Sequence, residues 1–389
     1  MKITVLGGAG AMARSAVLDL VESPEVKNLI LGDIDLKALE ELKNSLRSNK
    51  VSIGRVDITD HKSLVQFISG SNAVINGTVY YYNVKIMKAC LEAKAHYVDL
   101  GGLFHVARKQ MLLDEDFKKA RLTAVLGMGS APGIVNVMAR YAYDRLDTIE
   151  YVRIRDGIVN FTKTKSPLGI PYSLETILDE FVMNPFIFEN GIWVELKPFA
   201  RPEEVDFPEP VGIQTTFATL HSEVATIPVA FKDKGIQEVS FKLALPKSFE
   251  EKLRFLVDLG FGSKKPVSIG KTRVAPRDLV LTIAKNLPKS QGKLDDHKVL
   301  WVDAKGEKNG KIVEYRLEAI LHPYEKWNMR CSSFSVGFPL ATVGKMLASN
   351  QVKVKGAVGP EQAIQPEVLF KELSKRGIEV TATIKQKAY

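Results

Sequence analysis

The stretch ITVLGGAGAMA, residues 3–13, decides the fold of this chain. Its apolar start, Ile3–Leu6, predicts a strand, and apolar residues at helical spacing predict a helix over residues 12–21. Between them lies the pattern G-x-G-x-x-A, from Gly8 to Ala13. Glycines permit the tight turn and a close approach of the backbone to a pyrophosphate, and the alanine lets the helix pack closely on the sheet. We therefore predict a dinucleotide-binding turn.

Polar residues at the ends of the next strands are expected to complete the cofactor site. Asp33 follows the second strand, where a carboxylate accepts hydrogen bonds from both ribose hydroxyls and repels a 2′-phosphate. NAD is therefore favoured over NADP, with a helix-capping role as the alternative for Asp33 and with Asp35 or Lys37 able to modulate the preference. The pair after the third strand is expected at the adenine, and the trio after the fourth at the nicotinamide half. In chain order, the expected cofactor contacts are Gly8, Gly10, Ala11, Met12, Asp33, Ile34, Asp57, Ile58, Asn76, Gly77 and Thr78.

Strand and helix signals alternate through the first third of the chain. Short apolar runs at 3–6, 29–31, 51–56, 73–76, 97–100 and 123–126 predict six strands, with helical segments between them. This order predicts the α/β class and a doubly wound parallel Rossmann sheet, because right-handed crossovers place helices on both faces.

The pattern changes at about residue 149. Segments that alternate between apolar and polar residues, such as 151–155, 238–243 and 312–317, predict a mixed or antiparallel sheet. Residues 197–210 hold four prolines and predict a long ordered loop. Two helices are expected near the C-terminus, at 340–348 and 366–376.

Composition excludes several classes of protein. With 45% hydrophobic and 25% charged residues the 389-residue chain is globular, and no apolar run is long enough to span a bilayer. Cys90 and Cys331 are too few for a disulfide framework, and we expect a cytoplasmic protein. The net charge of +9 is concentrated in residues 231–389, which hold 29 basic and 17 acidic side chains. No run of Lys and Arg exceeds two residues, so we expect no nucleic-acid partner.

The six histidines offer no metal site that the sequence reveals. They form no helical pair and no cluster with cysteine, which zinc sites usually require. We therefore expect no bound metal.

Several longer motifs resemble the saccharopine dehydrogenase family, most closely its NAD-dependent L-lysine 6-dehydrogenase branch. The similarity extends over almost the whole chain. The motifs are Tyr80-Tyr81-Tyr82-Asn83, Cys90-Leu91-Glu92-Ala93, Tyr97 to Gly102, Gly129 to Asn136, Tyr172 to Glu175, Val274 to Asp278 and Gly359 to Gln362.

The resemblance implies a Rossmann domain that is interrupted by a substrate domain and completed by C-terminal helices. We predict a Rossmann NAD-binding domain at 1–130, an inserted α+β substrate and dimerisation domain at 131–335, and a returning segment at 336–389. It also implies a homodimer and hydride transfer between NAD and a carbon that bears an amine. Two departures, His221-Ser222-Glu223 and the tyrosines at 80–82, leave the substrate open.

Two residues are the candidates for acid–base chemistry. Asp99 ends a central strand before two glycines, and we expect it to contact the substrate amine, with capping of the next turn as the alternative. His221 is the candidate acid or base, oriented by Glu223, with a locally satisfied strand residue as the alternative. The expected substrate contacts are Tyr80, Gly101, Gly102, His105, Tyr172, Glu223 and Arg330, with Arg277 as a second candidate for a carboxylate.

The leading hypothesis is an NAD-dependent dehydrogenase that oxidises the ε-amine of L-lysine, a small amino-acid substrate. The alternatives are a saccharopine dehydrogenase, an imine reductase of polyamine synthesis that resembles carboxynorspermidine dehydrogenase, and an NAD(H) sensor without catalysis. A saccharopine pocket would present several Arg or Lys side chains, because saccharopine carries three carboxylates.

Overall fold

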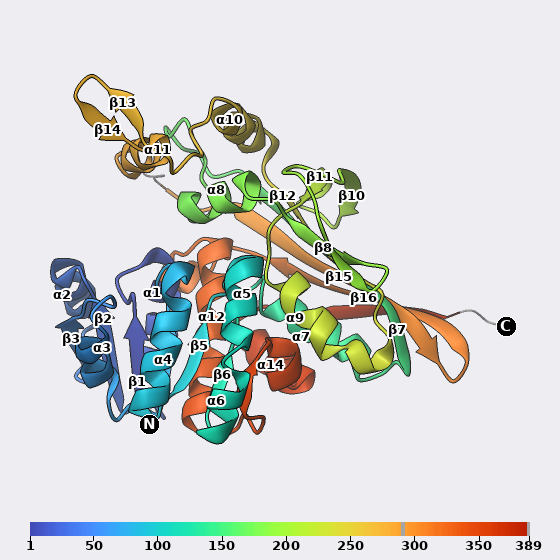
Figure 1. Ribbon diagram of the computed structural model, residues 1–389, viewed down its shortest axis with the longest axis horizontal. Helices are drawn as coiled ribbons and strands as arrows, with labels where there is room; N and C mark the ends of the chain where they lie inside the picture. Colours follow the sequence, from blue (N-terminus) through green and yellow to red (C-terminus); the bar gives the residue numbers. More distant parts are fainter. Residues whose placement is uncertain (289–291, 387–389) are drawn as a thin grey trace.

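A seven-stranded parallel sheet organises the N-terminal part of the protein (Figure 1). The computed structural model describes residues 1–288 and 292–386. Neighbouring strands follow the order β17-β6-β5-β4-β1-β2-β3, and every pairing is parallel. The strands are β1 (Lys2–Leu6), β2 (Asn28–Asp33), β3 (Val51–Arg55), β4 (Ala73–Asn76), β5 (His96–Asp99), β6 (Thr123–Val125) and β17 (Gly356–Val358). The predicted doubly wound sheet and its six N-terminal strands are confirmed.

Helices cover both faces of this sheet, because its central strands β1, β4 and β5 are buried on both sides. One face carries α1 (Ala11–Glu22), α2 (Leu36–Leu46) and α12 (Cys331–Ala348), which join the larger apolar core. The other face carries α3 (His61–Ile68), α4 (Asn83–Ala93) and α6 (Asp114–Lys119), whose core includes the buried ring of Phe117. The sequence did not reveal α5 (Leu103–Met111), because charged residues and a preceding pair of glycines mask its apolar face.

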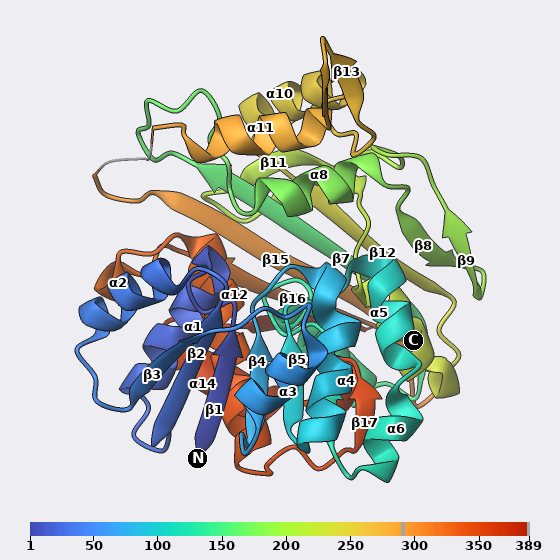
Figure 2. The ribbon, with the colours of Figure 1, turned by 60° about the vertical axis from the view of Figure 1, so that its left-hand side comes forward.

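A nine-stranded mixed sheet forms the second layer (Figure 2). Its main path is β10-β11-β12-β7-β15-β16-β18, in which β12 and β7 are parallel and the other neighbours antiparallel, while β8 pairs with β12 and β9. The strands are β7 (Thr148–Asn160), β8 (Phe186–Glu189), β9 (Ile192–Glu195), β10 (Glu203–Phe207), β11 (Gly212–Ala218), β12 (Glu238–Ala244), β15 (Asp296–Lys308), β16 (Lys311–Leu321) and β18 (Thr381–Gln386). The expected loop at 197–210 is partly wrong: it contains β10, which forms because Val205 and Phe207 bury alternate side chains.

The remaining helices surround this second sheet. Figure 2 shows α10 (Lys247–Asp258) and α11 (Pro276–Lys285) on the side away from the N-terminus. The other elements are α7 (Ile134–Tyr143), α8 (Leu174–Val182), α9 (Glu223–Ala230), α13 (Pro360–Ala363), α14 (Pro366–Ser374), a hairpin of β13 (Val267–Ile269) and β14 (Thr272–Val274), and short 3-10 turns at Tyr80–Tyr82, Lys232–Lys234 and Glu325–Trp327.

The C-terminal segment serves both sheets. Helix α12 packs on α1, and β17 joins β6, as expected for a return to the Rossmann sheet. In contrast to the prediction, β18 then pairs with β16 in the mixed sheet, and the predicted division at residue 336 falls inside α12. Only its last turns were predicted, because α12 is buried on nearly every side and lacks an amphipathic pattern.

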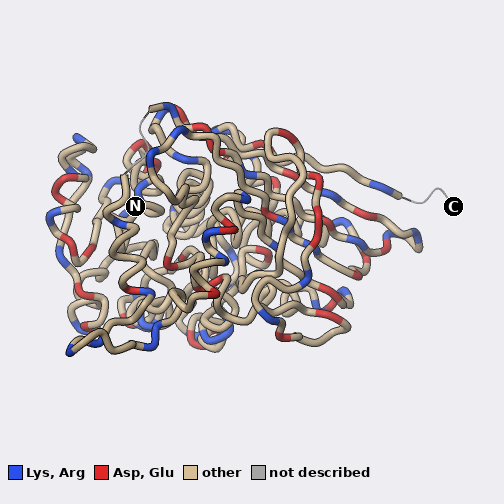
Figure 3. Tube along the Cα trace, turned by 90° about the horizontal axis from the view of Figure 1, so that it is seen from above, with Lys and Arg blue, Asp and Glu red and all other residues tan. Residues whose placement is uncertain are grey.

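Charges are distributed over the whole molecule. In Figure 3, Lys and Arg alternate with Asp and Glu along the trace in both halves. Within the described ranges, no helix combines the length and the hydropathy that a bilayer crossing requires.

Candidate functional site

In the turn after β1, the main chain at Gly7 lies directly against the main chain at Gly77. Gly7 has φ +71°, and a Cβ there would lie 2.9 Å from the carbonyl carbon and oxygen of Gly77. The N–H groups of Gly7 and Gly8 donate to Gly32 O at 2.8 and 3.2 Å, which folds the turn against β2. The residue that needs positive φ is therefore Gly7, one position before the motif that the sequence displayed. Ala13 is small for a matching reason, since its Cβ lies 2.7 Å from the Cβ position of Gly77.

Helix α1 begins at this turn without a side-chain cap. Its N-cap residue is Gly10, so the first N–H groups, those of Ala11 and Met12 among them, receive no capping hydrogen bond from a side chain. Such a helix end binds anions through its N–H groups and its dipole. The crowded glycines and the uncapped helix therefore fit a dinucleotide pyrophosphate.

Asp33 lies beside the same turn. Its Oδ2 accepts from Ala9 N at 3.2 Å, and its Oδ1 accepts from Asp35 N at 3.2 Å. The capping alternative for Asp33 is wrong, because the cap of α2 is Asp35, whose Oδ1 accepts from Ala38 N at 3.0 Å. The neighbouring Ile34 is 59% exposed, so an apolar side chain is available where the adenosine half is expected.

The residues after β3 and after β4, which we expected at the adenine and at the nicotinamide half, lie in different surroundings. Asp57 accepts from the hydroxyl and N–H of Thr59, which lowers the pKa of its carboxyl, while Ile58 packs partly buried on the second core. Asn76 is fully buried and holds the loop after β4 together, since its Oδ1 accepts from Thr78 N and Thr78 Oγ1. Its side chain thus supports the loop after β4 from behind, and Gly77 and Thr78 of that loop line a pocket.

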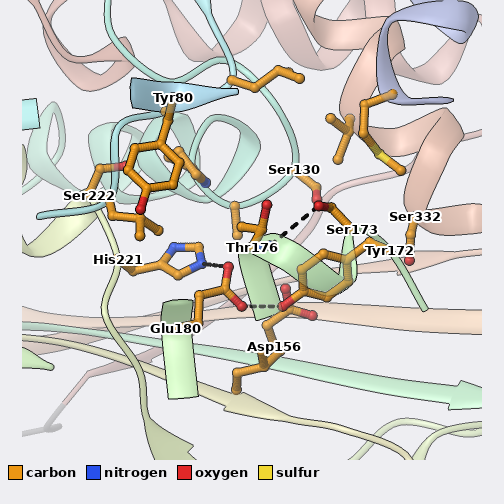
Figure 4. A pocket seen from close by; sticks show the side chains of 18 of the residues that line it. Tyr80, Ser130, Asp156, Tyr172, Ser173, Thr176, Glu180, His221, Ser222 and Ser332 are labelled. Atoms are coloured by element: carbon orange, nitrogen blue, oxygen red, sulfur yellow. Dashed lines mark hydrogen bonds and ion pairs between the residues drawn. The ribbon is translucent and has the colours of Figure 1, made fainter. Parts of the chain in front are cut away.

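A pocket of about 220 Å³ lies where the two sheets face each other (Figure 4). From the Rossmann side it is lined by Met12, Gly77, Thr78 and residues after β5 and β6, and from the mixed sheet by Asp156, Leu243 and Lys298. We call it the interdomain pocket. Its other polar lining residues are Tyr80, Ser130, Tyr172, Ser173, Thr176, Glu180, His221, Ser222 and Ser332. A substrate in this pocket lies next to the carboxyl ends of β1 and β4, where the nicotinamide is expected.

Asp99 does not line this pocket, which corrects its expected role as the amine contact. Its Oδ1 accepts from Gly101 N and Gly127 N, and its Oδ2 accepts from Tyr97 and Gln110. Burial raises the pKa of the Asp99 carboxyl, and the four donors act against that rise. The carboxyl therefore holds the turn after β5, as the alternative interpretation proposed.

His221 does line the pocket, with both ring nitrogens near carboxylates. Nδ1 lies 2.7 Å from Glu223 Oε2, Nε2 lies 3.5 Å from Glu180 Oε1, and the ring stacks on Phe241 at 3.7 Å between centroids. Burial disfavours the charged imidazole, but Glu223 and Glu180 outweigh burial and raise the pKa of His221 to about 10. The two carboxylates thus favour the protonated form of the His221 ring.

Two tyrosines approach the pocket from opposite domains. The hydroxyl of Tyr172 donates to Glu180, so Figure 4 shows a continuous path from His221 through Glu180 to Tyr172. Tyr80 donates to Asp179 Oδ2 at 2.8 Å, and Asp179 also pairs with Arg277. Tyr80 therefore fastens the Rossmann loop to α8, and Arg277 is a partner of Asp179 outside the pocket lining.

Three expected substrate residues lie elsewhere. His105 is exposed on α5 and meets the ring of Phe186 edge to face at 5.4 Å. Gly102 caps α5 behind the lining residue Gly101. Arg330 lines a separate cavity together with Arg14 of α1. These corrections arise because short sequence distance to Gly101 or to a helix start does not determine which way a side chain points.

Sequence reasoning missed the buried charges of the pocket. Lys298 Nζ lies 2.7 Å from Asp156 Oδ2 and donates to Ser130 Oγ at 3.1 Å. Burial raises the pKa of Asp156, and Lys298 opposes that rise. The one available signal was a lysine and an aspartate interrupting strands that are otherwise apolar on the buried face.

A dinucleotide crevice that opens onto a pocket with a proton donor defines a Rossmann oxidoreductase. The chain belongs to the saccharopine dehydrogenase family: residues 3–125 match the saccharopine dehydrogenase NADP binding domain, and residues 129–378 match the saccharopine dehydrogenase C-terminal domain. It is an NAD(P)-dependent dehydrogenase.

Curated relatives extend over nearly the full chain. A carboxynorspermidine synthase from Vibrio alginolyticus is 25% identical, covering 90% of this chain and 91% of its own. A carboxyaminopropylagmatine dehydrogenase from Synechocystis is 21% identical, covering 97% and 96%. The apo saccharopine dehydrogenase (L-Glu forming) from Saccharomyces cerevisiae has the same fold, with a TM-score of 0.74, 16% identity and 99% coverage of both chains.

Proposed function

We propose that this protein is an NAD(P)-dependent imine reductase that forms a carboxylated secondary amine of the polyamine type. The observation that carries the proposal is the charge of the interdomain pocket. Asp156 and Glu180 line it and Glu223 lies behind His221, whereas Lys298 and His221 are the only basic residues among the described lining residues. The lining itself holds two carboxylates and two basic groups, so it has no surplus of positive charge for the three carboxylates of saccharopine, and the carboxylate of Glu223 behind it favours an amine-rich substrate.

The names of the relatives support the same choice. Both relatives described above are named for carboxylated amines, carboxynorspermidine and carboxyaminopropylagmatine. They favour the imine-reductase alternative over the L-lysine 6-dehydrogenase reading that the motifs led us to expect. The substrate of this chain is therefore sought first among compounds in which a secondary amine joins a carboxylated unit to a cationic chain.

The cofactor would be held by the crowded turn of Gly7, Gly8 and Gly10, by the uncapped start of α1, and by Gly77 and Thr78. When bound, NAD(P)H supplies the hydride that reduces a C=N bond. The residues of the chain then have two tasks, which are to bind the cationic substrate and to manage one proton.

His221 performs the proton transfer in this proposal. As the C=N bond is reduced, the imidazolium donates one proton to the nitrogen and becomes a neutral imidazole. A proton from solvent, taken up once the product has left, restores the imidazolium, which Glu223 and Glu180 favour. Glu180 lies 3.5 Å from His221 Nε2, where its carboxylate stabilises positive charge on the substrate nitrogen. Glu180 itself accepts a hydrogen bond from the hydroxyl of Tyr172. Burial of His221 to 6% exposure keeps bulk water from competing for the proton.

A substrate panel tests the proposal in the oxidative direction. The purified protein is mixed with NAD or NADP and with carboxynorspermidine, carboxyaminopropylagmatine, saccharopine or L-lysine, and NAD(P)H formation is followed by absorbance. We expect turnover with one of the two carboxylated polyamines at a kcat/KM at least tenfold above those for saccharopine and lysine. A higher kcat/KM for saccharopine or lysine contradicts the proposal.

We further propose NAD as the preferred cofactor, on the position of Asp33 beside the glycine turn. The matching family domain is named for NADP binding, so the preference needs a direct test. Asp33→Ser should lower the ratio of kcat/KM for NAD to that for NADP by about tenfold or more, because it removes a ribose acceptor and a negative charge. Asp35→Ser separates this effect from the modulating role that the sequence allowed for Asp35: its carboxylate caps α2, a serine keeps a cap there, and the ratio should stay unchanged.

A homodimer remains part of the proposal. Strand β18 is the edge of the mixed sheet and every described residue of it is exposed, including Ile384 at 54%. Light scattering of the purified protein tests this state, and a monomer mass at micromolar concentration contradicts it.

A further inference from the structure

The buried pair Asp156 and Lys298 occupies the floor of the interdomain pocket. The two residues lie on neighbouring antiparallel strands, where Asp156 of β7 is opposite Leu300 of β15, so Lys298 is two residues along on the same face. Their exposed fractions are 2% and 6%, and both line the pocket. Burying two charges costs free energy that a single pair seldom repays, so such a pair in a pocket invites a functional explanation.

Each member of the pair retains capacity to bind a ligand. Asp156 Oδ1 is buried and accepts no hydrogen bond from any residue that the structure describes. Lys298 Nζ has three N–H donors, of which one reaches Asp156 Oδ2 and one reaches Ser130 Oγ. A carboxylate oxygen that can accept from an ammonium group and a lysine N–H that can donate to a carboxylate therefore lie side by side in the same pocket.

We propose that Asp156 and Lys298 bind the α-amino acid end of the substrate. The α-ammonium donates to Asp156 Oδ1, and the α-carboxylate accepts from the third N–H of Lys298 and from the hydroxyl of Ser130. This assignment rests on the proposed function only in that the pocket takes an amine with an amino-acid end. It holds equally for a carboxylated polyamine, for saccharopine and for lysine.

The assignment orients the substrate in the pocket. The amino-acid end binds at the mixed sheet, while the nitrogen that reacts is placed near His221 and Glu180. The amino-acid end is a zwitterion, so it adds no net charge to the Asp156–Lys298 pair, and its carboxylate is held by Lys298 despite the nearby Glu180. Amines that lack the carboxylate leave the third N–H of Lys298 without an acceptor and should bind more weakly.

Isothermal titration calorimetry with the NADH-loaded protein tests the assignment without turnover. The probes are two pairs that differ by one carboxylate, carboxynorspermidine with norspermidine and L-lysine with cadaverine. In the wild-type protein we expect the carboxylated member of at least one pair to bind about tenfold or more tightly. Lys298→Met should reduce that preference to within about twofold, and Asp156→Asn should weaken the carboxylated probe by about tenfold.

Two further variants keep the test decisive. The double variant Asp156→Asn/Lys298→Met removes both charges without leaving one unpaired, and it should also lose the preference if Lys298→Met alone does not fold. Lys242→Met is the matched control, because Lys242 is a mostly buried lysine of β12 that pairs with Glu203 outside the pocket lining. It should keep the wild-type preference.

The outcomes separate the two proposals. A carboxylate preference that Lys298→Met abolishes supports the amino-acid site even where no polyamine is turned over. A preference that survives in Lys298→Met and in the double variant, or that is missing in the wild-type protein, overturns the site even where polyamine turnover is observed.

Discussion

His221 Nδ1 lies 2.7 Å from Glu223 Oε2, and both side chains are buried in the interdomain pocket wall. Burial alone would keep this histidine neutral, yet Glu223 and Glu180 raise its pKa to about 10. Because the folded-state pKa is above the ordinary value, this pairing stabilises the fold below about pH 6.5 and loses its contribution as pH rises through about 10. Activity that needs the imidazolium should fall over the same upper range.

The first prediction concerns a variant that lacks the Glu223 carboxylate beside His221. Glu223→Gln should lower the pKa of His221, so that the fall in the rate of imine reduction moves to lower pH and kcat near neutral pH drops about tenfold or more. In the wild-type protein and in Glu223→Gln, kcat and the urea midpoint are each measured as a function of pH. His221→Gln serves as the companion variant, which should have no such titration, and an unshifted profile in Glu223→Gln would falsify the assignment.

The second prediction concerns Asp99, which the structure assigns to the turn after β5. Asp99→Asn replaces one carboxylate oxygen by an NH₂ group. Two of the four donors that point at Asp99 then meet a donor in place of an acceptor. The free energy of unfolding should fall by about 2–6 kcal/mol, while the KM for the amine in the folded protein stays within about twofold. Asp57→Asn, at an exposed turn where the amide oxygen still accepts from Thr59, should shift the urea midpoint much less than Asp99→Asn does. A large rise in KM with unchanged stability would restore Asp99 as a substrate contact.

The third prediction tests the turn after β1 by comparing two glycines that have the same φ angle. Gly7 and Gly310 both have φ +71°, but a Cβ at Gly310 would meet no atom within 4 Å. Gly7→Ala should weaken NADH binding at least tenfold and cost about 1–3 kcal/mol, because the methyl group collides with Gly77. Gly310→Ala should cost only about 1 kcal/mol of backbone strain and leave NADH fluorescence titrations unchanged. Equal NADH affinities in the two variants would contradict the crowding argument.

The fourth prediction addresses the contact between domains at Asp179. Its carboxylate accepts from Tyr80 and Tyr81 and pairs with Arg277, whose side chain is 3% exposed. Burial raises the pKa of Asp179, but Arg277 and the tyrosines outweigh burial and lower it, so this contribution to stability is lost as pH falls.

Asp179→Asn leaves the Arg277 charge buried without its partner and should destabilise the protein by about 3–5 kcal/mol in urea unfolding. Lys264→Met is the control on the same carboxylate, since the Lys264 side chain is 52% exposed and its pair should contribute about 1 kcal/mol or less. Similar losses in the two variants would argue against a buried Asp179–Arg277 pair.

The sequence by itself determined the Rossmann sheet, its glycine turn and the family. These features are local: an apolar run, a turn that only glycine permits and a short helix are all read within about 30 residues, as from Ile3 to Asp33. The same locality explains why Asp33 lies beside the glycine turn and why Gly77 and Thr78 line the pocket, while their contact with a cofactor stays a prediction. The motifs at Tyr172 and His221 likewise identified two residues of the pocket.

Only the tertiary structure decided which charged side chains share the pocket. Asp156 and Lys298 are 142 positions apart and meet because β7 and β15 pair in one register. Glu180 of α8 reaches His221 in the segment between β11 and α9, and Asp99, one residue from the lining Leu100, turns inward to four donors. Strand alternation and sheet register set these directions, and neither is encoded in a short motif. The chemistry of the pocket therefore follows from long-range pairing, whereas the cofactor turn follows from local sequence.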